Sequence, residues 1–289
     1  MPPHSSLLSL AAALARILPL PLKRALYRFP VLARFLRRAL NRAAPTGLTE
    51  TEIAAGLAAG FRMALDLQSE KDYWLGTYEP DLQAALKALV QPGWTVYDVG
   101  ANVGYVTLML AKAVGAQGQV YAFEALPANQ ERWRRTVALN ALQGRVHLIP
   151  AAVAEASGTV PFLIGPSDDM GKAAGSAGRS LDYADSIEVP ALALDDFVYA
   201  QGNPPPALLK MDIEGGEVLA LPGMRRLLHE AHPLLLLELH GPESARAAWD
   251  ALTAAGYTLH RMAHGFPQVH TLDELDWKAY VLGRLSAPR

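Results

Sequence analysis

The chain of 289 residues contains no cysteine. Disulfide frameworks, cysteine-ligated zinc and thiol catalysis are therefore excluded, while the redox state of the compartment stays open. Acidic residues are absent from residues 1–49, which hold eight Lys or Arg, whereas the rest of the chain carries 18 basic and 28 acidic residues. A basic N-terminal segment thus precedes an acidic body. Because an acidic body does not attract polyanions, we expect no nucleic acid partner.

The sequence also lacks a clean apolar run that could cross a bilayer. Residues 7–22 are mostly apolar, but Arg16, Pro19 and Pro21 interrupt them. The segment falls short of the roughly 20 apolar residues that a spanning helix needs. Its first basic residue lies inside the apolar stretch and not before it, unlike the order in a secretory signal. We therefore expect a cytoplasmic protein.

Residues 31–42 are expected to form a basic amphipathic helix. Their apolar side chains follow helical spacing, and Arg34, Arg37 and Arg38 fall on the opposite side. We favour a lid or dimer arm packed against the acidic body. The alternative is peripheral attachment of residues 1–44 to the anionic inner face of a membrane. The oligomeric state stays open.

Apolar segments alternate with helical stretches along the body of the chain. The expected strands are 94–99, 119–125, 146–153, 207–213, 233–240, 257–262 and 277–285. The expected helices are 105–114, 127–142, a short one after Gly216, and 243–255. This alternation predicts a doubly wound α/β fold, with a mostly parallel sheet that helices cover on both faces. The last two strands lie too close for a helical crossover, so an antiparallel strand should end the sheet.

We divide the chain into a helical, basic extension over residues 1–59 and one α/β domain over residues 60–289. Within the domain, residues 165–186 hold six charges, four Gly and four Ser without apolar periodicity. A loop of this length is usually either a lid over an active site or a disordered insertion, and both interpretations stay open.

A glycine loop follows the first strand of this domain, with the sequence Asp98-Val-Gly-Ala-Asn-Val-Gly104. Gly100 and Gly104 frame a turn where the backbone can approach a ligand closely, and the helix that follows offers free N–H groups. The dinucleotide fingerprint requires a glycine where this chain has Asn102. The loop thus predicts a nucleotide-like cofactor that is not a dinucleotide.

The charge of Asp98 indicates which cofactor this is. A carboxylate beside the loop would repel phosphates, but it attracts a cation. S-adenosylmethionine carries an ammonium and a sulfonium, and Asp98 is expected to attract its ammonium directly or through water. We expect Gly100, Ala101, Asn102 and Gly104 to contact the cofactor as well.

The ends of the second and third strands should complete the cofactor site. Glu124 ends the second strand, where a carboxylate can accept both ribose hydroxyls, although nicotinamide enzymes also place an acid there. From topology, adenine should lie near Ala152 and Val153 at the end of the third strand. A nicotinamide-dependent oxidoreductase or epimerase therefore stays open as an alternative.

Four stretches together resemble the FkbM family of methyltransferases. They are the glycine loop at 98–105, Ala122-Phe123-Glu124, Leu194-Asp195-Asp196, and Lys210-Met-Asp-Ile-Glu-Gly-Gly-Glu217. The resemblance covers about residues 60–285 and leaves out residues 1–50. It implies a class I methyltransferase fold with seven sheet strands and methyl transfer to a hydroxyl of a sugar, polyketide or similar metabolite. After Glu124 the family commonly has Pro, where this chain has Ala125, a change of turn only.

The residues at the ends of the fourth and fifth strands are the candidates for catalysis, because ligands of open α/β sheets bind there. A hydroxyl acceptor must lose a proton, and we predict Asp212 as its base, followed by His240 and Glu238. Glu214 and Glu217 are expected to order the Gly215-Gly216 turn. We predict no metal, although Asp212, Glu238 and His240 offer an alternative site for magnesium.

The sequence therefore predicts an S-adenosylmethionine-dependent O-methyltransferase. Its acceptor would be a hydroxyl of a small molecule such as a sugar, glycolipid or polyketide. The alternatives are the nicotinamide enzyme and a non-catalytic, membrane-associated protein that binds the cofactor without chemistry.

Overall fold

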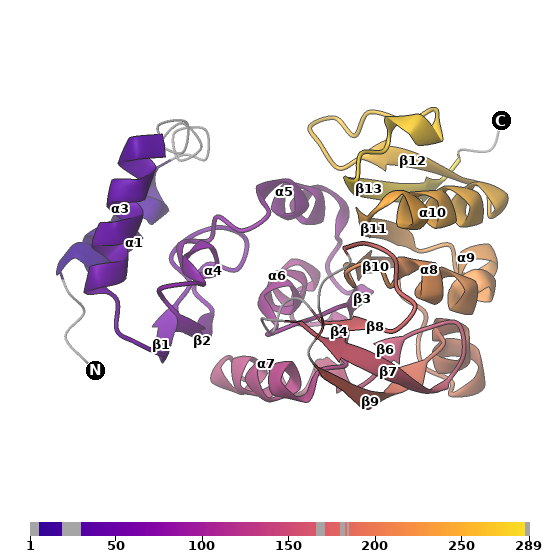
Figure 1. Cartoon of the computed structure of the whole chain (residues 1–289), viewed down its shortest axis with the longest axis horizontal. Helices are drawn as coiled ribbons and strands as arrows, with labels where there is room; N and C mark the ends of the chain where they lie inside the picture. Colours follow the sequence, from indigo (N-terminus) through magenta and orange to yellow (C-terminus); the bar gives the residue numbers. More distant parts are fainter. Residues whose placement is uncertain (1–5, 19–29, 166–170, 180–182, 184, 287–289) are drawn as a thin grey trace.

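The computed structural model describes residues 6–18, 30–165, 171–179, 183 and 185–286. Figure 1 shows a helical N-terminal part at one end and a sheet with its covering helices over the rest. This arrangement confirms the predicted doubly wound α/β fold with a helical extension.

A seven-stranded sheet forms the centre of the molecule, in the order β12-β13-β11-β10-β3-β4-β5. All neighbours pair in parallel except β13, which is antiparallel to both β11 and β12 and is the expected antiparallel C-terminal strand. The strands are β3 (Thr95–Val99), β4 (Gln119–Phe123), β5 (Val146–Ile149), β10 (Leu208–Met211), β11 (Leu234–His240), β12 (Tyr257–Arg261) and β13 (Lys278–Leu285).

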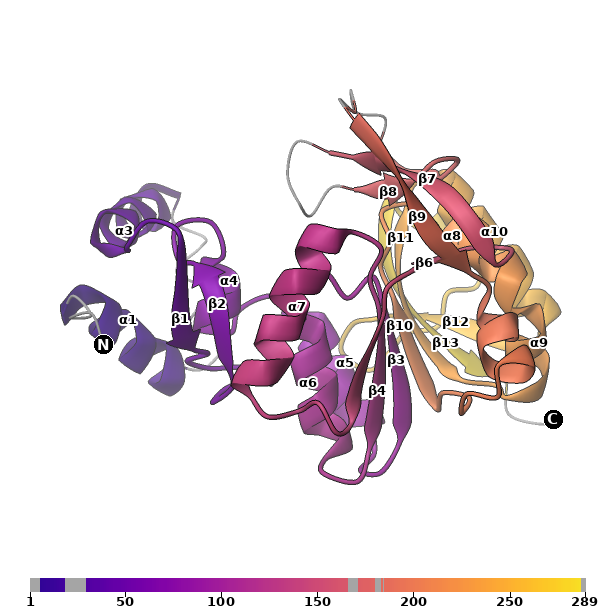
Figure 2. The ribbon, with the colours of Figure 1, turned by 90° about the horizontal axis from the view of Figure 1, so that it is seen from below.

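Helices cover both faces of this sheet, as Figure 2 shows. One layer consists of α5 (Pro80–Leu89), α6 (Tyr105–Val114) and α7 (Pro127–Leu139). The other consists of α8 (Glu217–Ala220), α9 (Arg225–Glu230) and α10 (Pro242–Ala254), with short η1 (Asp196–Ala200), η2 (Leu221–Met224) and η3 (Leu272–Glu274) in the connections. Along β3, Val96 packs into the core under α6, while Tyr97 and Val99 pack into the opposite core. The pleat therefore turns Asp98 toward α6.

The expected third strand, 146–153, is corrected by the structure. It ends at Ile149, and residues 152–153 form β6 (Ala152–Val153) in a second sheet. Pro150 stands between the two parts, and proline has no N–H for a sheet ladder. The second sheet has the order β6-β9-β7-β8, from β7 (Gly158–Ile164), β8 (Lys172–Ala173) and β9 (Asp185–Leu192). The sequence reading did not predict this sheet.

The expected loop 165–186 therefore contains β8 and the first residues of β9. Lys172 holds the described part of it in a tight curve, because its ammonium donates to the carbonyls of Ala177 and Arg179, both at 2.8 Å. Asp168, Asp169 and Asp182 of this segment lie outside the described residues.

The N-terminal part consists of α1 (Ser6–Ile17), α3 (Pro30–Ala43), β1 (Leu48–Glu52), β2 (Arg62–Asp66) and α4 (Lys71–Leu75). The predicted amphipathic helix at 31–42 lies within α3. Strands β1 and β2 pair as a hairpin on either side of the division at residue 59, which stays a prediction. Among the residues that the structure describes, no helix is long and apolar enough to cross a membrane.

Candidate functional site

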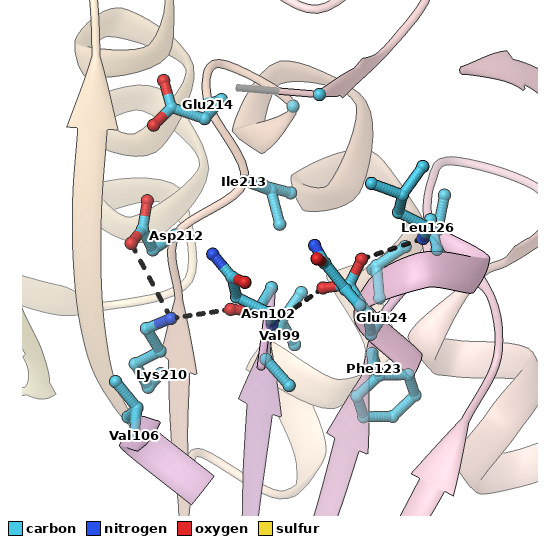
Figure 3. A pocket seen from close by; sticks show the side chains of 18 of the residues that line it. Val99, Asn102, Val106, Phe123, Glu124, Leu126, Lys210, Asp212, Ile213 and Glu214 are labelled. Carbon is cyan, nitrogen blue, oxygen red and sulfur yellow. Dashed lines mark hydrogen bonds and ion pairs between the residues drawn. The ribbon is translucent and has the colours of Figure 1, made fainter. Parts of the chain in front are cut away.

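A pocket opens at the carboxyl ends of β3, β4, β10 and β11, where the topology predicts a ligand site. The glycine loop forms its floor, and Figure 3 shows the side chains of Asn102, Glu124 and Asp212 around it. Gly100, Ala101 and Asn102, which are expected to contact the cofactor, line the pocket. The predicted cofactor and catalytic residues therefore converge on one cavity, with the three exceptions of Asp98, Gly104 and His240.

Gly100 is required where the loop passes the end of β10. Its φ of +79° lies in the left-handed region, and a Cβ built there would lie 1.9 Å from the carbonyl oxygen of Asp212. Gly104 has a different role, because it precedes α6 and its missing Cβ makes room for Trp133, at 3.0 Å. Gly104 shapes the loop from behind and does not line the pocket.

Asp98 lies under the loop and not in the pocket. Its side chain is fully buried, and the hydroxyl of Thr107 donates to one carboxylate oxygen at 2.6 Å. Trp133 in turn donates to the Thr107 hydroxyl at 3.0 Å. Burial raises the pKa of Asp98, although the Lys210 ammonium and Thr107 oppose this. The expected contact between Asp98 and the cofactor is therefore corrected to a buried position behind the pocket wall, because the pleat of β3 turns it toward α6.

Lys210 connects Asp98 to the pocket. Its ammonium lies 3.6 Å from Asp98 Oδ1, 3.8 Å from Asp212 Oδ2, and donates to the carbonyl of Gly100 at 3.1 Å. Burial disfavours its charged form, but the neighbouring carboxylates of Asp98 and Asp212 raise its pKa above the usual value. A single buried cation thus ties the end of β10 to the glycine loop. In the sequence, Lys210 stands out only as part of the stretch 210–217 that resembles the family.

Glu124 faces the pocket from the end of β4, as predicted. Its two carboxylate oxygens accept the backbone N–H groups of Asn102 and Leu126, each at 2.8 Å. Burial raises the pKa of Glu124, while these two hydrogen bonds lower it. The backbone contacts fix the carboxylate and leave lone pairs on both oxygens for hydroxyls of a ligand.

The apolar side of the pocket lies beyond Glu124. Ala152 and Val153, near which adenine is predicted to lie, line the pocket but belong to β6 of the second sheet. Phe162 of β7 and Ala173 of β8 add to the same wall. The second sheet therefore supplies the surface on which a flat aromatic group can lie.

The acidic end of the pocket brings together the candidates for catalysis. Asp212 and Glu238 line the pocket, and Asp212 keeps one-fifth of its side chain exposed. Burial and the neighbouring carboxylate of Glu238 raise the pKa of Asp212 to about 6, against the opposing effect of Lys210. Burial also disfavours ionisation of Glu238, but His240 and Lys278 lower its pKa to about 2. The pKa values of the Asp212 and Glu238 carboxyl groups are therefore well separated.

His240 lies behind these carboxylates and does not line the pocket. Its Nε2 is 3.2 Å from Glu238 and 3.9 Å from Asp212, and its Nδ1 is 3.7 Å from Glu217. Burial disfavours the imidazolium, but the carboxylates of Glu217 and Glu238 raise the pKa of His240 to about 10. Its expected place in the pocket is corrected: it is a buried imidazole among carboxylates.

Glu217 is completely buried and orders the turn before α8, as expected. It accepts the backbone N–H of Ile213 at 3.2 Å and the hydroxyl of Ser244 at 2.9 Å. Gly215 within this turn has a φ of +94°, and its missing Cβ makes room for the carbonyl of Ala177. The turn and the described part of 165–186 are therefore packed together.

One ligand atom from each of Asp212, Glu238 and His240 lies within 4.8 Å of the others, a spacing that a metal ion could use. Lysine ammonium groups already contact two of the three, because Lys278 pairs with Glu238 and Lys210 lies near Asp212. The absence of a metal stays our prediction.

Three tyrosines that the sequence reading did not select complete the pocket. Tyr73 of α4, Tyr78 before α5 and Tyr105 of α6 line it, and the rings of Tyr73 and Tyr105 stack with centroids 4.6 Å apart. Tyr105 ends the glycine-loop stretch 98–105, but no motif surrounds Tyr73 and Tyr78. The signal available for these two was three aromatic residues within six positions, Tyr73, Trp74 and Tyr78.

The strand order, the glycine loop and the acid at the end of β4 together define a class I methyltransferase. Residues 98–259, more than half of the chain, match the methyltransferase FkbM domain. The chain therefore belongs to the FkbM methyltransferase family, and its cofactor is S-adenosylmethionine. This excludes the nicotinamide alternative.

Solved structures of methyltransferases are similar to this chain. The methyltransferase FkbM from Methylobacillus flagellatus KT shares 16% identity and a TM-score of 0.44, over 88% of this chain and 60% of that one. This chain thus spans about 60% of the length of that relative. An O-methyltransferase from Bacillus cereus in complex with SAH shares 13% identity and a TM-score of 0.44, over 72% of this chain and 82% of that one. A comparison with curated protein sequences finds no match.

Proposed function

We propose that this protein transfers the methyl group of S-adenosylmethionine to a hydroxyl oxygen of a sugar, glycolipid, polyketide or similar small molecule. The observation that carries the proposal is Asp212. A partly exposed carboxylate in the pocket with a pKa of about 6 is suited to accept the proton that a hydroxyl must lose. An aspartate carboxylate with its ordinary, lower pKa would be a weaker base.

The pocket residues fit the cofactor group by group. Glu124 is held with free lone pairs toward the pocket, which suits the two ribose hydroxyls. The wall at Ala152 and Val153 suits adenine. Ala101 and Asn102, at the narrow turn that Gly100 permits, would lie along the methionine part. S-adenosylmethionine supplies an already activated methyl group, so the chain needs only to align the acceptor and exclude water.

In the proposed reaction, Asp212 takes the hydroxyl proton as the oxygen forms its bond to the methyl carbon. The carbon–sulfur bond breaks, its electron pair stays on sulfur, and the products are the methyl ether and S-adenosylhomocysteine. Glu238 and His240 act as positioning residues in this scheme, because the first stays ionised and the second stays protonated near neutral pH. Together with Lys210 they hold the carboxylate of Asp212 in place.

A screen of hydroxyl acceptors for S-adenosylhomocysteine release tests the proposal. We expect release with a glycoside, glycolipid or polyketide, and a product that gains one methyl group on oxygen. The matched control is the same acceptor with its reactive hydroxyl replaced by hydrogen, which should be inert. Release with amine or thiol acceptors, and none with any hydroxyl compound, would contradict O-methylation.

The pH dependence of kcat/KM is expected to follow Asp212. The unprotonated carboxylate is the active form, so kcat/KM should rise by about tenfold per pH unit below the pKa of about 6 and level off above it. Lys210, Glu238, His240, Glu214 and Glu79 are charged groups close enough to Asp212 to interact with it. Rates measured between mildly acidic and neutral pH check this.

Glu79 is a second carboxyl group that could produce the acidic limb of the pH profile, so its contribution must be distinguished from that of Asp212. Burial and the carboxylates of Glu238 and Asp212 raise the pKa of Glu79 to about 7. We expect Glu79→Gln to keep the acidic limb and Asp212→Asn to abolish it. The opposite pattern would assign the proton to Glu79 and overturn the role of Asp212.

Small molecules are the expected acceptors for reasons of charge as well. The body of the chain carries an excess of acidic residues, which disfavours nucleic acid. We propose that the protein works in the cytoplasm, where its cofactor is made available.

A further inference from the structure

Helix α1 exposes a continuous apolar stripe. Leu7, Leu10, Leu14 and Ile17 follow one another at intervals of three or four residues, which places them on one side of the helix. They are 39%, 55%, 45% and 76% exposed, respectively. The other side of α1 is already packed, because Leu8 and Ala15 are buried. The stripe is thus the side of α1 that the rest of the described chain leaves uncovered.

Helix α3 lies beside α1, as Figures 1 and 2 show, and exposes an aromatic side chain and positive charge of its own. Phe35 is 68% exposed, and Arg38 and Arg42 follow it at intervals of three and four residues and are exposed too. We call Leu7, Leu10, Leu14, Ile17, Phe35, Arg38 and Arg42 the N-terminal face. Residues 1–49 contain no acid that would offset its charge.

The N-terminal face does not act as a lid on the cofactor pocket. The pocket takes its lining from α4, α6 and the sheets, and none of its lining residues belongs to α1 or α3. Figure 2 shows these two helices at the end of the molecule beyond α4 and the β1–β2 hairpin. A lid formed by this arm over the acidic body, which we favoured from sequence, is therefore not what the described residues form.

A second copy of the chain would complement the N-terminal face less well than a lipid bilayer. In a symmetric pair the same patches face each other, so the arginines would approach like charges. In an asymmetric pair the stripe would need an apolar surface elsewhere. Outside α1 and α3 the described residues expose only three large apolar side chains, namely Leu48, Trp277 and Leu285. An anionic bilayer offers both apolar depth for the stripe and negative charge for the arginines.

We propose that the N-terminal face docks this protein onto anionic lipid bilayers as a peripheral contact. The apolar stripe enters the boundary between headgroups and acyl chains, and the arginines remain among the phosphates. Docking in this way needs no spanning helix. The inference does not depend on which molecule is methylated.

Co-sedimentation of the full chain with vesicles tests this inference. We expect binding to phosphatidylcholine vesicles that contain phosphatidylglycerol, and at least tenfold weaker binding to phosphatidylcholine alone. Leu10→Ser combined with Leu14→Ser should weaken binding to the anionic vesicles by at least tenfold, because two exposed leucines no longer enter the bilayer. Arg38→Gln combined with Arg42→Gln should also weaken it, and the remaining binding should depend less on salt.

Trp277→Ser combined with Leu285→Ser is the matched control, since it removes two exposed apolar side chains in and next to β13 and should leave vesicle binding unchanged. S-adenosylhomocysteine binding shows that each variant is folded, and it is measured without any acceptor. Equal vesicle binding by the leucine variant and the wild type would overturn the proposal. So would a stable dimer in sedimentation velocity that the leucine substitutions convert to a monomer, because the face would then be a contact between copies.

Discussion

Replacing Asp212 with asparagine is expected to lower kcat by about 10²- to 10⁴-fold, the usual contribution of a general base. The amide keeps the shape of the carboxylate at the end of β10 but cannot accept the proton of the acceptor. Binding of S-adenosylhomocysteine should stay within a few fold, because the pocket wall at Glu124 and Ala152 is untouched. Initial rates of S-adenosylhomocysteine release and calorimetric titration measure the two quantities separately.

Asp250→Asn is the control for this substitution, because Asp250 is an exposed aspartate of α10 and its change should leave kcat unaltered. The rates are measured with and without EDTA, and we expect no difference. An Asp212→Asn enzyme that keeps its rate within threefold of the wild type would contradict the role of Asp212. If neither the wild type nor the Asp212→Asn protein releases S-adenosylhomocysteine with any acceptor, the result would instead support the non-catalytic alternative.

Replacing Glu124 with alanine is expected to weaken cofactor binding by about 100-fold. Two hydrogen bonds from ribose hydroxyls to a charged acceptor are together worth about 3 kcal/mol. The substitution also leaves the backbone N–H groups of Asn102 and Leu126 without their acceptor, which loosens the loop. Calorimetric titration with S-adenosylhomocysteine measures the change in Kd.

Glu131→Ala is the matched control, because Glu131 is an exposed glutamate on α7 and its loss should leave the Kd unchanged. Thermal unfolding without ligand separates loss of binding from loss of fold. A Glu124→Ala protein that binds S-adenosylhomocysteine within threefold of the wild type would show that the ribose is held elsewhere.

The central sheet could be predicted from the sequence because its strands are continuous apolar runs and its helices alternate with them. Helix α6 has the predicted bounds, and the other elements of the sheet differ by a few residues. The second sheet could not be found in the same way. Only one of the seven residues of β7 and three of the eight residues of β9 are buried, so their sequences lack the apolar signal of a buried strand. Pro150 then separates β6 from the strand to which we joined it.

Residues of the site could be predicted from the sequence where the local backbone or the end of a strand requires a particular residue type. Gly100 stands where no side chain fits, and Glu124 ends a strand at the sheet edge. Asp98 shows the limit of this reasoning. It lies beside the loop, but the alternation of side chains along β3 directs it toward Thr107 of α6 and out of the pocket. His240 lies behind the pocket, where Asp212 and Glu217 from another part of the chain lie near it together with Glu238 of its own strand.

Partners that come from distant parts of the sequence were the least predictable. Lys210 acquires its role from Asp98 and Gly100, which precede it by more than a hundred residues. Tyr73 and Tyr78 reach the pocket from the N-terminal side through the packing of α4 against the rest. A residue whose function depends on such contacts carries no local signature in one sequence.

The two tyrosines also bear on how this chain can be engineered. Tyr73 and Tyr78 come from the segment that follows the β1–β2 hairpin, and the ion pair between Glu70 and Arg132 joins that segment to α7 at 2.8 Å. The cofactor pocket is thus assembled across the seam between the N-terminal part and the sheet. The N-terminal part therefore cannot be exchanged by itself. A chimaera that takes this part from a relative must also take the residues of the α/β domain that contact it, or the pocket will not form.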